Sequence, residues 1–260
     1  FLVTDKMTEH GLLSSKTTNY HAPLFWSDGG TTVPNLNRSL LIELSKEFDL
    51  AATGDFGFPE GIGASDILNY VYAICHSTNF RIRYGEYLRL DYPKIQFTSD
   101  LGLFKKLAKL GNKIVQLHLM KNRRKPQDCT FVLPPDKEIG VDSLVQKISF
   151  EDSTIWINKD ETIGFQQVSQ EIWDFRFGGY QICKKWLSDR KPKGGRRPMP
   201  GVALSTADIE HYCGIIDTIK QTMQYMREVD ELIENNGGWP LNDPIPVKNL
   251  VLDIGQQTLF

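Results

Sequence analysis

Apolar residues recur at steps of three and four along much of the first half of the chain, a spacing typical of amphipathic helices. The pattern predicts helices at about 37–48, 65–77, 80–88 and 100–120. Gly111 lies inside the last of these segments and predicts a break into two helices at that point. Four glycines and a proline in residues 51–64 instead predict a loop between the first two helices.

The second half of the chain has a different pattern. Short runs of β-branched and aromatic residues predict an antiparallel set of strands at 130–133, 145–150, 154–158 and 163–165. Further short strands are predicted at 1–4, 22–26 and 249–254. A short helix is expected from about 181 to 188, and the longest helix from about 206 to 235. In the long helix eight apolar residues follow one another at steps of three or four, and Ser205 and Asp208 are spaced as in a capping box.

These elements predict an α+β fold with a helical N-terminal half, a small, mostly antiparallel sheet in the second half and one long C-terminal helix. We expect a mainly helical lobe at 1–128 and a lobe of sheet and long helix at 129–260, packed together as one domain. The chain starts at Phe1 and not at a methionine, which indicates a piece of a longer protein.

The composition is that of a folded globular protein, because 40% of the 260 residues are hydrophobic and 11% are aromatic. No run approaches 18 consecutive apolar residues, so we expect no membrane span. The formal net charge of −2 excludes a uniformly basic nucleic-acid-binding protein. Any site for a polyanion must therefore be a local patch of positive charge.

Positive charge is concentrated in two segments. Residues 101–127 contain eight basic residues and no acidic one, and residues 184–197 contain seven basic residues and one acidic residue. The predicted long helix is the reverse, with seven acidic residues and two basic ones over 205–235. Basic segments of this kind can bind the phosphates of a nucleic acid. A solvated surface loop beside packed aromatic side chains is the structural alternative.

Motifs that carry catalysis are not found in the sequence. It contains no GxSxG or HExxH motif, and its four cysteines share no metal-ligand spacing, so we expect reduced thiols in a cytosolic protein. Residues of the types found in a metal-dependent nuclease motif occur at Asp136 and at 189–191, but they are more than 50 residues apart, and the second group lies beside a loop and not on a strand. We therefore expect no catalytic residue, metal or cofactor in this chain, and keep a metal-dependent nuclease as the least favoured alternative.

Several short runs, taken in order along the chain, resemble one family. The series consists of Tyr70–Ser77, Phe80–Tyr84, Leu90–Ile95, Leu107–Leu119, Ile172–Tyr180 and Lys185–Lys191, followed by Ser205, Asp208 and His211. It resembles the C-terminal specificity region of type ISP restriction–modification enzymes and related adenine-specific DNA methyltransferases. The matches extend over about residues 20–235. One departure is the link from Pro192 to Leu204, which is longer and more basic than is usual in that family.

In that family this region is the target recognition domain, which follows the helicase-like and methyltransferase parts and helps to clamp DNA. The resemblance implies a fragment that binds double-stranded DNA and confers sequence specificity without catalysing methyl transfer. It also implies a methyltransferase part in the same parent chain, S-adenosylmethionine as the cofactor of that part, a cytoplasmic location and no membrane partner. The alternative is a protein-interaction module whose acidic long helix docks onto the methyltransferase part.

The charge pattern selects the candidate DNA-binding residues. The first group is the basic loop, with Arg190, Lys191, Lys193, Arg196 and Arg197. The second group consists of Arg123, Arg124 and Lys125. Arg176 and Tyr180 complete the set, because the two glycines between them would let another backbone approach closely. For this last pair, a tight turn with a packed tyrosine is the favoured structural alternative.

Overall fold

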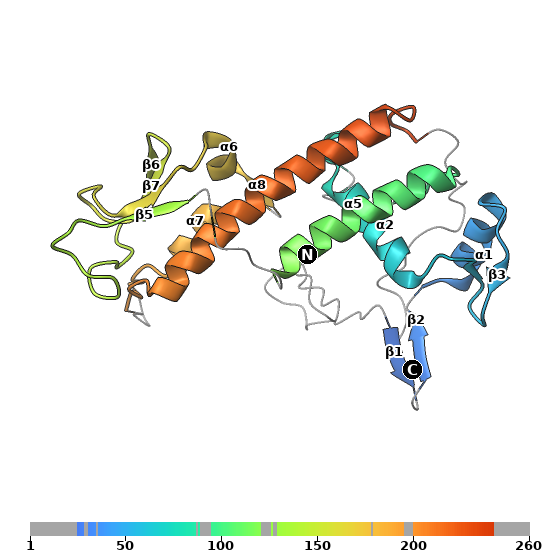
Figure 1. Ribbon diagram of the computed structural model, residues 1–260, viewed down its shortest axis with the longest axis horizontal. Helices are drawn as coiled ribbons and strands as arrows, with labels where there is room; N and C mark the ends of the chain where they lie inside the picture. The colour runs from blue at the N-terminus through green and yellow to red at the C-terminus, as the bar shows by residue number, and fades with distance from the viewer. Residues whose placement is uncertain are drawn as a thin grey trace. The chain divides into compact units, whose positions relative to one another are not determined.

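The computed structural model describes residues 25–28, 31–34, 36–86, 88, 95–120, 126, 129–177, 179–194 and 200–241 (Figure 1). The chain divides into two compact units, Phe1–Lys121 with Met223–Phe260, and Asn122–Thr222. The strands predicted at 1–4 and 249–254 lie outside the described residues. The described part of 22–26 belongs to β1 (Phe25–Asp28), which pairs antiparallel with β2 (Thr31–Pro34). Helices and small antiparallel sheets make up the described elements, so the predicted α+β fold is confirmed.

Three helices follow one another in the first unit. α1 (Arg38–Glu47) begins at Asn37, whose side chain accepts a hydrogen bond from the Ser39 backbone N–H at 2.8 Å. α2 (Ala64–His76) and α3 (Thr78–Arg83) are joined by Ser77, which caps α3. The helix predicted at 80–88 therefore begins two residues earlier, and α3 ends at Arg83. The predicted loop at 51–64 holds a small hairpin of β3 (Ala52–Thr53) and β4 (Phe58–Pro59).

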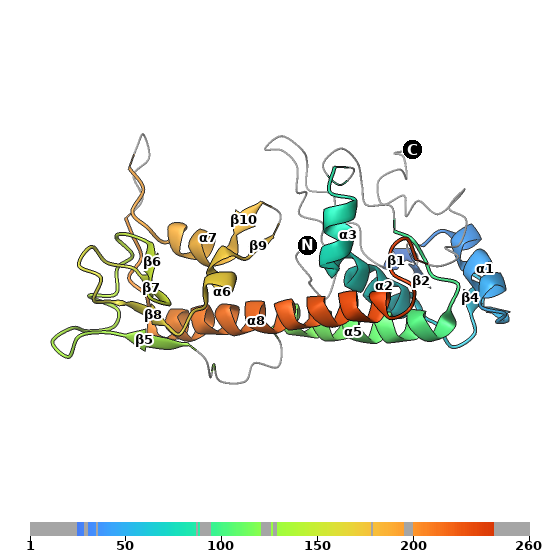
Figure 2. The ribbon, with the colours of Figure 1, turned by 90° about the horizontal axis from the view of Figure 1, so that it is seen from above.

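α5 (Leu101–Leu119) is one continuous helix, so the predicted break at Gly111 is wrong. A Cβ atom added at residue 111 would lie 1.8 Å from the backbone carbonyl oxygen of Asn69 in α2. Gly111 therefore permits the close approach of α5 to α2, which run beside each other in Figure 2. Gly111 thus allows two helices to pack closely and does not end a helix.

The core of the first unit contains a stack of aromatic rings. Tyr70 of α2 is fully buried, and its ring centroid lies 5.0 Å from that of Phe97 and 4.9 Å from that of Phe104. Its hydroxyl donates a hydrogen bond to the Gln96 carbonyl oxygen at 2.8 Å. Burial raises the pKa of Tyr70 far above the ordinary value of 10.0. Tyr70 is therefore a core residue and not part of a surface site.

The C-terminal end of α8 (Thr206–Glu234) also belongs to this unit. Val229 and Ile233 are buried in the same hydrophobic cluster as α1, α2 and α5. The carboxylate of Asp230 accepts hydrogen bonds from the Ser77 hydroxyl at 2.5 Å and from the Thr78 backbone N–H at 3.0 Å. A negative charge at this position stabilises the N-terminus of α3. One of the acidic residues of the long helix thus has a structural role.

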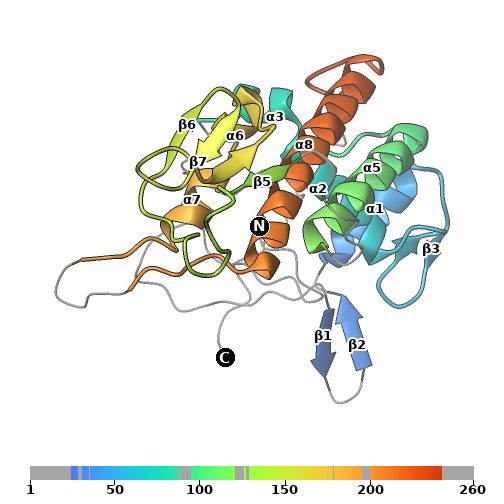
Figure 3. The same ribbon diagram turned by 60° about the vertical axis from the view of Figure 1, so that its left-hand side comes forward.

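A four-stranded antiparallel sheet in the order β5–β8–β7–β6 organises the second unit (Figure 3). Its strands are β5 (Thr130–Val132), β6 (Ser149–Glu151), β7 (Thr154–Trp156) and β8 (Gly164–Gln166). Phe165 lies opposite Phe131 on one side and opposite Ile155 on the other. The small antiparallel sheet is therefore confirmed, although the strand predicted at 145–150 begins only at Ser149.

Short elements connect this sheet to α8. They are α6 (Gln170–Asp174), the hairpin of β9 (Arg176–Phe177) and β10 (Tyr180–Gln181), and α7 (Ile182–Ser188). Of these, α7 was predicted from the sequence and α6 was not. The predicted capping box at the start of α8 is confirmed, because the Asp208 carboxylate accepts a hydrogen bond from the Ser205 N–H at 3.1 Å. In return, the Ser205 hydroxyl accepts one from the Asp208 N–H at 3.2 Å.

The apolar stripe of α8 faces the interior. All but Met223 of its eight predicted members are less than 10% exposed: Ile209, Tyr212, Ile216, Ile219, Met226, Val229 and Ile233. The stripe is therefore core and offers no open apolar face for a partner. No helix in the described ranges is long and apolar enough to cross a membrane.

The expectation of four reduced thiols is wrong for two of them. Cys129 and Cys213 form a disulfide with a Cα–Cα distance of 5.3 Å. They are 84 residues apart in the sequence, and the fold brings the residue before β5 beside α8. No local spacing could have indicated this pair. Cys75 and Cys183 are free.

Candidate nucleic-acid interface

Arg190, the first candidate of the basic loop, is held by contacts within its own unit. Its guanidinium carbon lies 3.3 Å from the centroid of the Trp186 ring, and its Nη1 donates to the Trp186 carbonyl oxygen at 3.2 Å. Its Nη2 lies 3.6 Å from the Asp208 carboxylate. The Trp186 ring in turn packs on buried Tyr212, with centroids 4.9 Å apart. Arg190 thus ties the start of the loop to α7 and to the start of α8.

The Asp208 carboxylate is the negative end of this arrangement. Hydrogen bonds from Ser205 lower the pKa of Asp208, and the nearby charge of Arg190 lowers it further. Asp208 is therefore ionised at neutral pH and neutralises part of the positive charge of Arg190. For this reason we regard Arg190 as a residue that positions the loop.

Lys184, Lys185 and Lys193 are more exposed than Arg190, whereas Lys191 is half-buried, as Arg190 is. Between 184 and 194 the chain has five basic residues and a single acidic one, Asp189. Asp189 pairs with Lys185 and, at 3.8 Å, with Lys193, while both lysine side chains keep nearly half of their surface exposed at 46% and 49%. One carboxylate thus faces two ammonium groups, and exposed pairs of this kind are weak. Since Lys184 is also exposed, the surface of α7 and its loop retains net positive charge.

The hairpin of β9 and β10 lies next to α7 in sequence. Its strands pair Arg176 with Gln181 and Phe177 with Tyr180, and Gly179 in the turn has a φ of +82°. The tight turn is therefore confirmed, but the packed tyrosine is wrong, because Tyr180 is 58% exposed. Arg176 is exposed as well, and the Lys185 ammonium lies 5.8 Å from the centroid of the Tyr180 ring. The Tyr180 ring and the Lys185 ammonium thus share one face of the hairpin, and Arg176, paired with Gln181, lies on the other face.

The other candidates lie outside the described residues. These are Arg196 and Arg197, which follow Gly194 along the loop, and Arg123, Arg124 and Lys125, which follow α5 in the sequence. Lys184 and Lys185 were not selected in the sequence analysis, although they belong to the same basic segment. Their position on α7, directly after the exposed hairpin, is the signal that could have found them.

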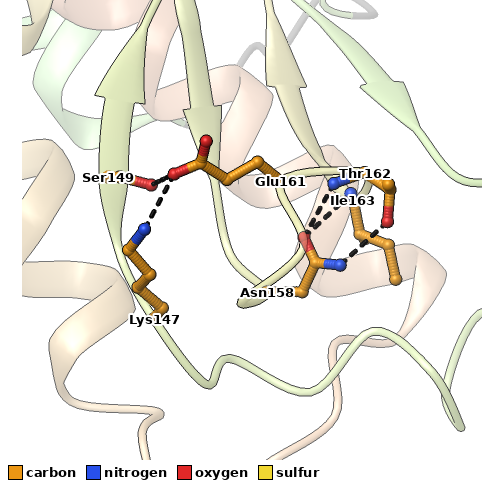
Figure 4. Close-up of polar contacts among 6 residues, drawn as sticks. All are labelled: Lys147, Ser149, Asn158, Glu161, Thr162 and Ile163. Atoms are coloured by element: carbon orange, nitrogen blue, oxygen red, sulfur yellow. Dashed lines mark hydrogen bonds and ion pairs between the residues drawn. The ribbon is translucent and has the colours of Figure 1, made fainter.

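The turn between β7 and β8 is fixed by side-chain hydrogen bonds (Figure 4). The Asn158 side-chain oxygen accepts from the backbone N–H groups of Thr162 and Ile163, each at 3.0 Å. The Glu161 carboxylate accepts from Lys147 at 2.8 Å and from the Ser149 hydroxyl at 2.9 Å, and the hydrogen bond from Lys147 lowers the pKa of Glu161. Lys147 thus has a carboxylate of its own, whereas Lys185 and Lys193 share the single carboxylate of Asp189.

No group of three or more His, Cys, Asp or Glu side chains arranged to hold a metal ion occurs within the part of the chain that the structure describes. Asp136 and the segment 189–191, which matched nuclease letters in the sequence, are not part of any such group there. The described residues therefore add no support for a metal-dependent nuclease.

Three solved structures are similar to this chain at low sequence identity. A DrdV–DNA complex matches 80% of this chain and 21% of its own, with a TM-score of 0.59 and 16% identity. A nuclease-deletion mutant of the Type ISP restriction–modification enzyme LlaGI with a DNA substrate mimic matches 64% of this chain and 14% of its own (TM-score 0.48, 19% identity). The ATP-dependent Type ISP restriction–modification enzyme LlaBIII bound to DNA matches 65% of this chain and 11% of its own (TM-score 0.49, 17% identity).

This chain thus spans only 11–21% of the length of those proteins. No curated protein matches its sequence. The family model, in contrast, matches most of the chain, over residues 1–229. The chain therefore belongs to the Type ISP C-terminal specificity domain family.

Proposed function

We propose that this chain is the DNA target-recognition part of a restriction–modification enzyme and that it binds duplex DNA and confers sequence specificity. Membership of the specificity-domain family over residues 1–229 carries the proposal. The positively charged surface of α7 and its loop, in a protein of net charge −2, supports it, because a local cationic patch is what a polyanion requires. The DrdV structure, whose fold is similar to that of this chain, is a complex with DNA.

The two kinds of surface in the second unit have different tasks in this proposal. Lys191 and Lys193, with Arg196 and Arg197 further along the loop, contact phosphates and supply affinity. Arg190 positions the loop through Trp186 and Asp208. The exposed β9–β10 hairpin carries Arg176 and Tyr180 to the base edges in the major groove, where arginine can bond guanine at two points.

Methyl transfer belongs to another part of the parent chain in this proposal. The family name describes a specificity domain, and the chain is a small fraction of the length of the enzymes that it resembles. The methyltransferase part would hold S-adenosylmethionine and act on the adenine of the bound site. The chain itself is then a non-catalytic fragment of a cytoplasmic enzyme.

The salt dependence of DNA binding tests the loop. We expect the Lys191→Ala, Lys193→Ala double variant to make the slope of log K against log salt less steep by about 1.8, because each lost phosphate contact removes about 0.9. Arg196→Ala with Arg197→Ala should have the same effect. The measurement is fluorescence anisotropy of a labelled 40-base-pair random duplex titrated with the purified chain, starting at low salt.

Lys147→Ala is the control, because it also removes an exposed lysine that the domain uses internally, in a pair with Glu161. Its slope should equal that of the wild type. An unchanged slope in both loop variants would remove the loop from the interface. If the wild-type chain bound no duplex even at low salt, the proposed function itself would be wrong for this chain.

Arg176 tests the reading of bases. We expect Arg176→Ala to change the free energy of unfolding by less than about 0.5 kcal/mol, because the side chain is exposed. Its effect should be on specificity, with a loss of about 1–3 kcal/mol of discrimination at one base pair. The readout is selection of bound duplexes from a random pool, in which the motif enriched by the wild type should lose its preference at one position. Enrichment of the full motif by the variant would exclude Arg176 from base contact.

A further inference from the structure

The exposed face of α5 is entirely neutral or basic. The buried residues of this helix, which include Leu103, Leu107 and Ile114, define the side that packs on the core. At 100° per residue, the opposite side carries four lysines within an arc of about 100°. These are Lys105, Lys106, Lys109 and Lys113, and each of them is exposed. The remaining exposed positions of the helix are Gly102, Asn112 and Gln116.

These lysines have no carboxylate partner in the described part of the chain. No ion pair joins any of the four ammonium groups to an acidic side chain there. Lys113 instead makes a cation–π contact: its ammonium lies 5.4 Å from the centroid of the Tyr225 ring. Some other exposed lysines are paired, as Lys137 is with Asp142 and Lys147 with Glu161. Exposed Lys46, Lys159 and Lys184 have no ion pair within the described residues either, but they do not form a stripe of like charge on one helix.

The arrangement costs the folded protein stability. Lys105, Lys109 and Lys113 follow one another at four-residue steps, and like charges at that spacing repel one another on a helix surface. A solvated helix face usually alternates charges of both signs, which removes this cost. A face that keeps only one sign is suited to a ligand with the opposite charge.

The dimensions fit a nucleic-acid backbone. From Lys105 to Lys113 the helix rises about 12 Å, at about 1.5 Å per residue. One strand of duplex DNA carries a phosphate about every 3.4 Å along the axis, so the stripe can face three or four successive phosphates. Apolar side chains of α5 are buried in the core, which leaves no exposed apolar face for insertion into a membrane.

We propose that the Lys105, Lys106, Lys109 and Lys113 face of α5 is a second DNA-contacting surface, in the unit that does not carry the basic loop, and that it binds the sugar–phosphate backbone without regard to sequence. The inference rests on the proposed function, because it assigns a further part of the chain to the same duplex. Its contribution is affinity and its own share of the salt dependence. Sequence discrimination stays with the second unit.

A triple variant, Lys105→Gln, Lys109→Gln and Lys113→Gln, tests this surface in the full 260-residue chain. Its slope of log K against log salt should be less steep than that of the wild type by about 2.7. Between 50 and 200 mM salt, the affinity of the variant should therefore fall about 40-fold less than that of the wild type. The thermal midpoint of unfolding should not decrease, because the change removes repulsion between like charges.

The matched control is Lys46→Gln, Lys137→Gln and Lys159→Gln, which removes the same charge from three exposed positions on separate elements. It should leave the slope within about 0.9 of the wild-type value, the amount for a single phosphate contact. A wild-type slope in the α5 variant, together with a reduced slope in the Lys191→Ala, Lys193→Ala variant, would overturn this inference and leave the proposed function intact. Absence of duplex binding by the wild type would overturn both. Binding of duplex RNA in preference to DNA, lost in the α5 variant, would overturn the assignment of this face to DNA.

Discussion

Gly111→Ala should destabilise the protein by about 1–3 kcal/mol, although alanine is the better helix former by about 1 kcal/mol. The new Cβ would lie 1.8 Å from the carbonyl oxygen of Asn69 and 2.6 Å from its carbonyl carbon. Both atoms belong to the backbone of α2 and cannot turn aside as a flexible side chain can. The two helices must therefore separate, and the contacts of Leu107 and Ile114 with the core would loosen.

Urea unfolding of the variant, followed by circular dichroism, gives the free energy directly. Asn112→Ala is the control, because the neighbouring residue is exposed on the same helix and should gain a few tenths of a kcal/mol from its propensity alone. The two substitutions thus should change stability in opposite directions. A Gly111→Ala variant as stable as the wild type would show that α5 does not approach α2 as closely as the structure has it.

Acidification should destabilise the protein at pH values at which most carboxylates are still ionised. Burial, together with the neighbouring charges of His118 and Arg81, lowers the pKa of His76 to about 3. Burial lowers the pKa of His118 to about 4. Both imidazoles are thus neutral in the folded state, whereas in the unfolded chain they ionise near the ordinary value of 6.5. Below that pH the unfolded state binds more protons, so stability falls as the pH falls.

The two histidines do not destabilise the protein above pH 6.5. Below that pH the free energy of unfolding falls by up to about 1.4 kcal/mol per pH unit for each histidine, down to about pH 4 for His118 and about pH 3 for His76. The measurement is the urea midpoint at pH values from 7.5 to 4.5. His118 contacts the Tyr72 hydroxyl through its Nδ1 atom at 2.7 Å, so glutamine can keep a polar partner there. His118→Gln should reduce the slope of the free energy of unfolding against pH by the amount for one proton, about 1.4 kcal/mol per pH unit. A free energy of unfolding that stays constant from pH 7 to pH 5 would contradict the lowered pKa of both histidines.

Elements with long, regular patterns could be predicted from the sequence. α8 has eight apolar residues in unbroken helical steps and a capping box, and both its start and its end were found within one or two residues. The strands of the main sheet were located from their β-branched and aromatic runs. α6 and the β9–β10 hairpin were missed because five and two residues are too few to show a period.

Features that depend on distant contacts could not be predicted. The role of Gly111 is decided by the backbone of Asn69, more than 40 residues earlier, and the Cys129–Cys213 pair by the fold as a whole. Of the candidate site, the basic segments were found from charge alone. The different roles of the residues within these segments could not be predicted, because they depend on what each side chain contacts. Examples are the contacts of Arg190 with Trp186 and Asp208, and the position of the four lysines on one side of α5.

The order in which the chain is synthesised matters for the first unit. Its segments are separated by the whole of Asn122–Thr222, and its hydrophobic cluster includes Val229, Ile233 and Leu241, which are made after that segment. At about 5–20 residues per second, a ribosome needs roughly 5–20 s to add the intervening hundred residues. During that time α2 and α5 lack the part of α8 that completes their core, while the inserted unit already has all of its own segments. During synthesis the second unit can therefore complete its fold before the first unit does. Until then the apolar surface of the early helices is exposed and can bind chaperones.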